Sequence, residues 1–201
     1  MVEALGLGAP HAPVATPVDL DEAAGLLPGH IRTQSELNEW EQTNILDASR
    51  WLNHPARKSA DVLSEGFARE LHKRMFNRTW KWAGKFRQSD KNIGIDWRQI
   101  SVQLRDLFDD VKYQLEHKTY PVDEIAARFH HRLVWIHPYP NGNGRHARMM
   151  TDALLAKIGA EPFSWGHADL ISTGVTRETY LHALYAADAG DMTRLLAFVR
   201  S

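Results

Sequence analysis

The chain has 201 residues, of which 43% are hydrophobic and 24% charged, a composition typical of one globular domain with a sizeable core. It contains no cysteine, which excludes disulfides, cysteine-ligated metals and thiol nucleophiles. No apolar run is as long as a membrane span, and the first residues lack the basic start and apolar stretch of a signal peptide. We therefore expect a cytoplasmic protein with no membrane segment.

The net charge of −1 hides an uneven distribution of charge. Residues 1–49 carry eight acidic side chains and a single basic one, Arg32, whereas residues 69–98 carry nine basic and three acidic side chains. The two segments should attract each other. The basic segment has two interpretations: solvated helix faces, or a surface for phosphates or an acidic partner.

The first residues differ in character from the rest. Residues 1–30 are rich in proline and glycine and show no helical period, which predicts a loose arm ahead of a domain at 31–201. A helix is predicted over about 35–52, because Thr33 and Glu36 have the spacing of a capping box and apolar residues then recur on one face.

Apolar residues at helical spacing predict further helices along the remaining chain. These cover about 61–79, 99–117, 121–136, a stretch ending at Gly159, a stretch around Tyr180, and a short final helix capped by Asp191. Between Trp80 and Trp97 this period disappears, and the run Lys91, Asn92, Ile93, Gly94, Ile95 alternates like a short β-hairpin. The predicted fold is mainly α, a single-domain helical bundle with one hairpin.

Residues 137–148, HPYPNGNGRHAR, join two amphipathic helices and contain the groups best suited to chemistry. The glycines allow the backbone to approach a ligand closely, and the start of the following helix presents unpaired N–H groups, which favours an anion. Arg145 and Arg148 lie three residues apart and therefore share a helix face. Their planar guanidinium groups suit adjacent phosphates.

Four histidines lie in or near this segment. His137 ends the preceding helix beside the loop, and an imidazole with an unperturbed pKa of ~6.5 can accept a hydroxyl proton at neutral pH. His130, His131 and His146 are more simply explained as structural residues, and a zinc site built from all four is an alternative. The loop also fits G-x-G-x-x-A, but a dinucleotide site needs a preceding strand, and a helix precedes it here.

The loop resembles the signature of Fic-domain proteins of the Fic/DOC superfamily, H-x-F-x-[D/E]-G-N-G-R-x-x-R. The residues in register are His137, Gly142, Asn143, Gly144, Arg145 and Arg148. Residues 82–87 and the hairpin after them resemble the flap of the family, and residues 15–201 as a whole resemble a small subgroup labelled mobile mystery protein B.

The resemblance implies a protein adenylyltransferase that transfers AMP from ATP to a Tyr, Ser or Thr hydroxyl of a target protein. His137 would be the general base. The backbone of residues 142–144 and the Asn143 side chain would hold the α-phosphate, Arg145 the β-phosphate and Arg148 the γ-phosphate. Mg²⁺ would bridge the phosphates, and the flap at 91–95 would bind the target by strand addition.

Two residues of the loop depart from the family pattern. Asn141 stands where the pattern has an Asp or Glu that helps to hold the metal, and its carbonyl oxygen is a neutral candidate ligand. Tyr139 replaces the usual Phe, which we expect to change packing only. The change at Asn141 leaves open the transfer of a different phosphate-containing group.

Many Fic proteins carry an inhibitory helix with the pattern [S/T]-x-x-x-E-[G/N], whose glutamate pairs with the second arginine of the signature. Ser35 and Glu39 have this spacing, although Trp40 follows where Gly or Asn is usual. We therefore expect Glu39 to restrain activity through Arg148, with an exposed acidic helix face as the alternative.

Two expectations concern partners. A non-catalytic module that binds nucleotide or another anion, with the basic segment docked on an acidic partner, is the alternative to an enzyme. The subgroup resemblance suggests an antitoxin-like or DNA-binding companion and a toxin-like role on a mobile element. Direct binding of nucleic acid is not expected, because interleaved surface aromatics are lacking.

Overall fold

The computed structural model describes residues 25–31, 33–55, 59–167 and 175–201. Within these residues the chain forms seven α-helices and no β-strand, so the prediction of a mainly helical fold is confirmed. The elements are α2 (Gln34–Leu52), α3 (Glu65–Phe76), the 3₁₀ turn η2 (Trp97–Gln99), α4 (Ile100–His117), α5 (Val122–Ile136), α6 (Asn143–Lys157), the 3₁₀ turn η3 (Trp165–His167), α7 (Val175–Asp188) and α8 (Thr193–Val199). None of the described helices is long and apolar enough to cross a membrane.

Local sequence signals set the helix ends. The capping box that begins α2 is formed as predicted, with Thr33 and Glu36 each accepting the other's backbone N–H. Helix α3 starts at residue 65 and not near 61, because the Ser64 hydroxyl accepts the backbone N–H of Phe67. Asp191 accepts the backbone N–H of Thr193 at the start of α8.

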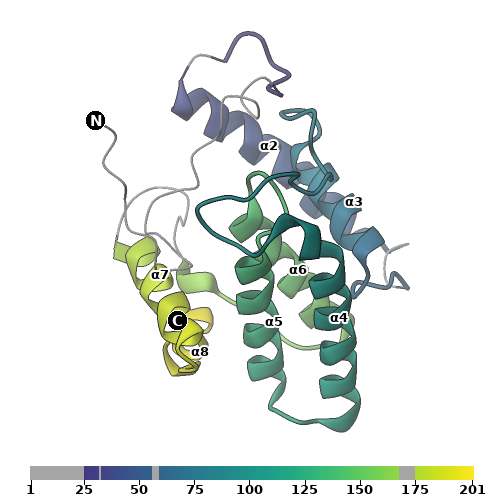
Figure 1. Cartoon of the computed structure of the whole chain (residues 1–201), viewed down its shortest axis with the longest axis vertical. Coiled ribbons are helices and arrows are strands. Elements are labelled where there is room, and N and C mark those ends of the chain that lie inside the picture. Colours follow the sequence, from purple (N-terminus) through teal and green to yellow (C-terminus); the bar gives the residue numbers. More distant parts are fainter. Residues whose placement is uncertain (1–24, 32, 56–58, 168–174) are drawn as a thin grey trace.

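The helices form three groups. Helices α4, α5 and α6 stand together in the middle, α2 and α3 pack on one another and α3 contacts α6, and the α7–α8 pair lies on the other side against α5 (Figure 1). The central helices supply much of the core, with Phe108, Phe129, Leu133 and Met150 all buried. The link between α5 and α6, which carries the candidate site, is therefore held between two rigid neighbouring helices.

The described end of the predicted arm is tied to the domain. Leu26 and Trp80 form an isolated antiparallel bridge, and the backbone N–H of Leu27 bonds to the carbonyl of Thr79 at 2.8 Å. The remainder of the predicted arm, residues 1–24, lies outside the described residues.

The expected attraction between the acidic and basic segments is present where both are described. The carboxylate of Asp47 on α2 lies 2.6 Å from the guanidinium of Arg78, and the indole N–H of Trp40 donates to the carbonyl of the same residue. The other exposed arginines of residues 69–98 also have carboxylate neighbours, in the pairs Arg69–Glu65, Arg74–Glu70 and Arg98–Asp96. These arginines are therefore partly neutralised, which favours solvated helix faces over a basic docking surface.

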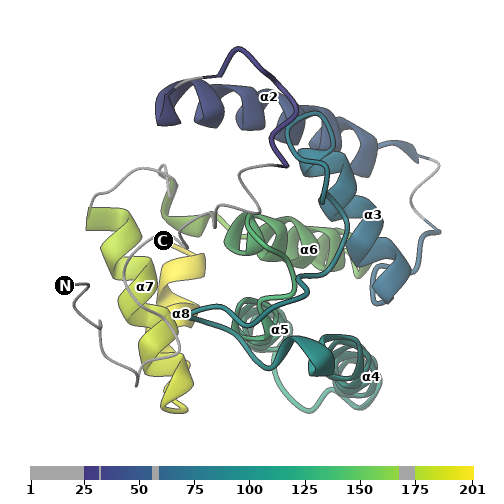
Figure 2. The same ribbon diagram turned by 45° about the horizontal axis from the view of Figure 1, so that its top comes forward.

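The predicted hairpin at 91–95 does not form: no strand pairing occurs between residues 81 and 96, all of which the structure describes. The segment instead crosses the end of the central helices between α3 and η2 (Figure 2). The cause is Arg87, whose buried guanidinium donates to the carbonyls of Ser89 and Ile95 and so takes up acceptors that a hairpin partner would use.

Candidate active site

The loop begins with a change of backbone direction at His137. Helix α5 ends there with His137 in the left-handed region at φ 54°, and its side chain is buried. Gly142, at φ 77°, then precedes α6, and a Cβ at this glycine would lie 2.5 Å from the ring of Phe76. The loop therefore needs glycine at 142 both for its dihedral angle and for the space that Phe76 occupies.

The Asn143 side chain closes the loop on itself. Its Oδ1 accepts the backbone N–H of Tyr139 at 2.9 Å, and its Nδ2 donates to the carbonyl of the same residue at 2.8 Å. This amide was expected to hold a phosphate, whereas in the structure it is buried and shapes the loop from inside.

Aromatic rings form the floor beneath the loop. The rings of His72 and Tyr139 stack with centroids 3.6 Å apart, and Phe76 and His146 border the pair. His72 accepts the backbone N–H of Gly84 at Nδ1, so its Nε2 carries the proton and donates to the carbonyl of Asn141 at 3.1 Å. Burial lowers the pKa of His72 well below its usual value and that of His146 to about 4, so both rings are neutral at pH 7.

The first turn of α6 supplies the anion site. The first backbone bond along this helix runs from the N–H of His146 to the carbonyl of Gly142, so the N–H groups of residues 143–145 have no partner within the helix. Gly144 has only the guanidinium of Arg148 near the place of a Cβ, which leaves room for a ligand beside the backbone. Three amides at the positive end of a helix dipole and two arginines favour a phosphate chain.

Arg87 fixes the position of the His137 backbone from outside the loop. Its guanidinium is 1% exposed and donates to the carbonyl of His137 at 2.7 Å, while its backbone N–H bonds to the carbonyl of Pro138 at 3.0 Å. Gly94 passes so close that a Cβ there would lie 2.7 Å from the Cβ of His137. The segment expected to be a flap therefore lies directly on the candidate general base.

A buried carboxylate pairs with the first arginine of the loop. Glu41 on α2 accepts from Arg145 at 2.7 Å and from the indole N–H of Trp80 at 2.7 Å. Glu39, the residue expected to restrain the site, is exposed on the same helix. The carboxylate that reaches the loop thus belongs to Glu41 and not to Glu39. It pairs with Arg145, whereas the expected partner was Arg148.

The second arginine has a different environment. The guanidinium carbon of Arg148 lies 5.9 Å from the centroid of the Tyr180 ring on α7, and no carboxylate among the described residues forms an ion pair with it. Burial lowers its pKa below the usual value, and the nearby Tyr180 and Asp152 oppose this shift. The guanidinium stays protonated at neutral pH.

The remaining histidines have structural partners. His130 contacts the hydroxyl of Tyr180 at 2.8 Å, His131 contacts Asp188 at 2.8 Å, and His146 contacts the carbonyl of Ala68 at 2.9 Å. Since these ring nitrogens face separate partners, a zinc site built from the four histidines is not formed. Among the described residues no three His, Asp or Glu side chains converge as metal ligands.

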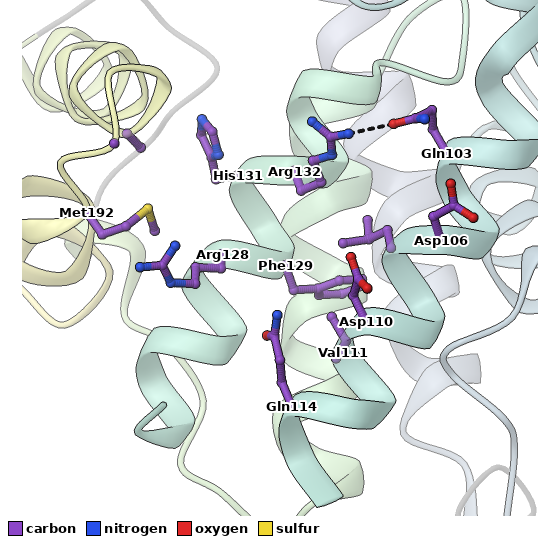
Figure 3. A pocket seen from close by; sticks show the side chains of 13 residues that line it. Gln103, Asp106, Asp110, Val111, Gln114, Arg128, Phe129, His131, Arg132 and Met192 are labelled. Atoms are coloured by element: carbon purple, nitrogen blue, oxygen red, sulfur yellow. Dashed lines mark hydrogen bonds between the residues drawn. The ribbon is translucent and has the colours of Figure 1, made fainter. Parts of the chain in front are cut away.

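A separate groove lies between α4, α5 and the turn before α8 (Figure 3). Its volume is about 370 Å³, and Asp106 and Asp110 face Arg128 and Arg132 across it. No residue of the 137–148 loop lines this groove. The candidate active site is therefore defined by the loop and not by this hollow.

Sequence reasoning identified the loop but missed the residues that support it. Glu41 lies four residues after Leu37 and four before Ile45, and so occupies the apolar face of α2, a position that itself indicates a buried partner. Arg87 and His72 carried no comparable signal, because their partners are backbone carbonyls and amides fixed by the fold.

Comparison with known proteins points to one family of similar sequences and folds. Residues 62–155 match the model of the Fic/DOC family, and the chain shares the helical fold of a solved Fic structure. The range includes the whole 137–148 loop as well as α3, the 81–96 segment, α4 and α5.

The curated relatives are adenylyltransferases. The chain is 27% identical over 187 residues to protein adenylyltransferase fic-1 of Caenorhabditis elegans, covering 89% of this chain and 34% of the relative. It is 30% identical over 135 residues to the Caenorhabditis briggsae protein of the same name, covering 65% of this chain and 25% of the relative. The chain thus spans about a third or less of these relatives.

Solved structures share the architecture. Fic-1 from C. elegans superimposes with a TM-score of 0.63 at 26% identity, covering 89% of this chain and 51% of that one. The BepC protein of Bartonella tribocorum, solved with bound AMPPNP, gives a TM-score of 0.66 at 18% identity, covering 90% and 97%.

Replacing Arg87 by Met should lower the free energy of unfolding by about 3–5 kcal/mol, because several buried carbonyls lose their donor. The measurement is urea unfolding monitored by circular dichroism. Arg98→Met is the matched control, since Arg98 is exposed and its pair with Asp96 should contribute less than ~1 kcal/mol. Equal losses in the two variants would contradict the role of Arg87.

The neutral state of His146 predicts a pH dependence of stability. Its folded pKa of about 4 lies below the unfolded value of ~6.5, so its contribution is complete above pH 6.5 and is lost as pH falls toward 4. Near pH 5 the unfolded wild-type chain binds a proton at His146 that the folded chain does not. His146→Gln should therefore lower the number of protons bound on unfolding by up to about one. Urea unfolding across pH 4–8 measures the slope, with the surface variant His117→Gln as control. An unchanged slope for His146→Gln would refute the assignment.

Proposed function

We propose that this chain is a protein adenylyltransferase that transfers AMP from ATP to a Tyr, Ser or Thr hydroxyl of a target protein. The observation that carries the proposal is the loop itself, where His137 and the open amides of α6 stand at the two ends of one short turn. The names of the curated relatives support the same reaction.

The reaction needs a general base and a binding site for the α-phosphate. The target hydroxyl oxygen forms a bond to the α-phosphorus, the bond from that phosphorus to the α–β bridging oxygen breaks, and pyrophosphate leaves. The imidazole of His137 takes the hydroxyl proton. Backbone N–H groups aimed at the α-phosphate stabilise the charge that develops on its oxygens in the transition state.

The phosphate contacts are assigned to groups that are available in the fold. The backbone N–H groups of residues 143–145 hold the α-phosphate, and the buried Asn143 amide acts by holding the loop in shape. Arg145 binds the β-phosphate once it leaves Glu41, and Arg148 binds the γ-phosphate.

Magnesium fits this site only when it binds together with the nucleotide. Asn141 is the metal candidate in the loop, and its Oδ1 already accepts the backbone N–H of Gly142 at 2.6 Å. A neutral oxygen with one engaged lone pair is a weak ligand for a hard cation, so most of the coordination would come from phosphates and water. Bound there, Mg²⁺ would neutralise charge on the phosphates.

The segment 91–95 is the proposed docking place for the target. Its residues alternate in exposure, with Lys91, Ile93 and Ile95 half-buried and Asn92 and Gly94 exposed. Gly94 lies against the Cβ of His137, so a peptide paired with this edge would bring its hydroxyl near the base. Because Arg87 occupies the carbonyl of Ile95, the target would pair with the other backbone groups of this segment.

Two features stay predictions. The neutral Asn141 leaves room for transfer of another phosphate-containing group, which the mass of the adduct on a modified target would reveal. Membership of the narrower subgroup, with an antitoxin-like or DNA-binding companion, rests on the resemblance of the sequence.

His137→Ala should reduce transfer of label from α-labelled ATP by about 10²–10⁴, because the target hydroxyl loses its proton acceptor. Auto-modification and labelling of a cell lysate are the measurements, with unfolding by urea to confirm that the variant is folded. His131→Ala, whose ring contacts Asp188 away from the loop, is the control. Retained labelling by folded His137→Ala would remove the assignment of the base.

We further propose that Glu41, in the role expected for Glu39, restrains the site by occupying Arg145. The pair is buried, with side-chain exposures of 5% for Glu41 and 17% for Arg145, so a phosphate must displace a well-formed ion pair. The carboxylate also repels phosphate oxygens at the same place.

Glu41→Gln should raise auto-modification and tighten nucleotide binding by roughly fivefold to tenfold, since the amide keeps a hydrogen-bond acceptor for Trp80 and loses the charge. Titration calorimetry with a non-hydrolysable ATP analogue gives the affinity. The control is Glu39→Gln, the same change on the exposed face of α2. If only the Glu39 variant is activated, the restraint belongs to Glu39.

A further inference from the structure

The groove between α4 and α5 has one wall of hydrogen-bond acceptors. Asp106, Asp110 and Gln114 follow one another at intervals of four residues and share the face of α4 that lines the groove (Figure 3). Among the described residues neither aspartate side chain has an ion pair or a hydrogen bond, and Oε1 of Gln114 is buried without a partner. A buried acceptor without a donor is unfavourable, so this wall favours a ligand that donates hydrogen bonds.

The opposite wall presents an arginine with unused donors. Arg132 on α5 faces the two aspartates, donates a hydrogen bond to Gln103, and has its guanidinium carbon 3.9 Å from the centroid of the Trp135 ring (Figure 3). This one bond leaves most of the five guanidinium N–H groups without a partner among the described residues. Burial lowers the pKa of Arg132, and Asp110 and Asp106 oppose the shift, so the group stays protonated. An ordered, half-buried guanidinium of this kind favours a carboxylate.

The second arginine of the groove is already neutralised. Both Nε and Nη2 of Arg128 donate to one oxygen of Glu124, at 2.9 and 2.7 Å. Its guanidinium carbon also lies 4.5 Å from the centroid of the Tyr120 ring. Of the two arginines that line the groove, Arg132 is therefore the one with its charge available for a ligand.

The bottom of the groove is apolar. It is formed by buried side chains from α4, α5, α7 and the turn before α8, namely Leu107, Val111, Phe129, Ala187 and Met192. The flexible thioether of Met192 can adapt to ligands of different shape. A volume of about 370 Å³ gives room for a small molecule with an apolar part.

Charges of both signs disfavour simpler ligands. A phosphate would be repelled by Asp106 and Asp110, and a polyamine by Arg132. No third carboxylate or histidine in the described part of the chain joins the two aspartates as a metal ligand. The ligand must therefore carry a positive and a negative group of its own.

We infer that this groove binds a free α-amino acid with an apolar side chain. Its carboxylate binds Arg132, its ammonium binds Asp106 and Asp110, and its side chain packs on the apolar bottom. An α-amino acid carries both charges on one carbon, which suits two facing walls of opposite charge that form no ion pair with each other. The site is separate from the 137–148 loop, none of whose residues lines the groove.

The experiment is titration calorimetry of the full chain with L-leucine and L-methionine, each compared with its amide and its N-acetyl derivative. The amide has no carboxylate and the N-acetyl derivative has no ammonium. At least one of the free amino acids should bind with a Kd below about 1 mM and at least tenfold more tightly than its derivatives, because each derivative leaves one wall without a partner. It should also raise the midpoint of thermal unfolding, since a ligand that binds only the folded chain stabilises it.

Groove variants locate the binding. Arg132→Gln should weaken binding of the amino acid by at least tenfold, and the double variant Asp106→Asn, Asp110→Asn by about fivefold to tenfold. Arg105→Gln and Asp109→Asn make the same changes at exposed positions of α4 outside the groove and should bind as the wild type does.

Urea unfolding confirms that each variant is folded, and the double variant tests the inference even if Arg132→Gln fails to fold, because both aspartates are exposed. Three results would overturn the inference: neither amino acid binds, a derivative binds as tightly as its parent, or binding is unchanged in the folded groove variants. Each of them leaves the proposed function intact, because that function depends on the loop.

Discussion

The candidate site depends on the buried guanidinium of Arg87. A charged group that is 1% exposed is unfavourable unless its donors are used, and here they reach the carbonyls of Ser89, Ile95 and His137. The carbonyl of His137 belongs to the C-terminal end of α5, where the helix dipole favours a cation. One side chain thereby holds together the end of α5, the first residue of the loop and the segment that crosses it.

One set of residues faces the phosphate, and a second set holds the loop in shape. The backbone of α6 and the two arginines face the phosphate, while Asn143, Phe76 and the stacked rings of His72 and Tyr139 hold the turn from below. The arginines differ in their neighbours, because Arg145 is paired with Glu41, whereas no carboxylate among the described residues forms an ion pair with Arg148. A charge-paired arginine must be released before it can bind phosphate, whereas one without an ion pair is already available. Nucleotide binding should therefore be controlled at Arg145.

The sequence predicted the helices and the loop well, because both depend on local patterns. Apolar spacing gave the helices, the capping box at Thr33 and Glu36 gave the start of α2, and glycine spacing gave the turn before α6. The prediction of a hairpin at 91–95 was wrong. Alternating side chains do not reveal that the buried Arg87 binds the carbonyl of Ile95. Glu41 was missed because its partner, Arg145, is distant in the sequence and lies on another helix.

The central claim is that residues 137–148, held by Arg87, form a cradle for a nucleotide phosphate chain beside His137. A crystal structure of the full chain with a non-hydrolysable ATP analogue tests it most directly. The account predicts an α-phosphate within hydrogen-bonding distance of the first amides of α6, the imidazole of His137 facing the α-phosphorus, and the contacts of Arg87 unchanged. An analogue seated in the groove between α4 and α5, or a histidine ring turned away from the phosphates, would contradict it.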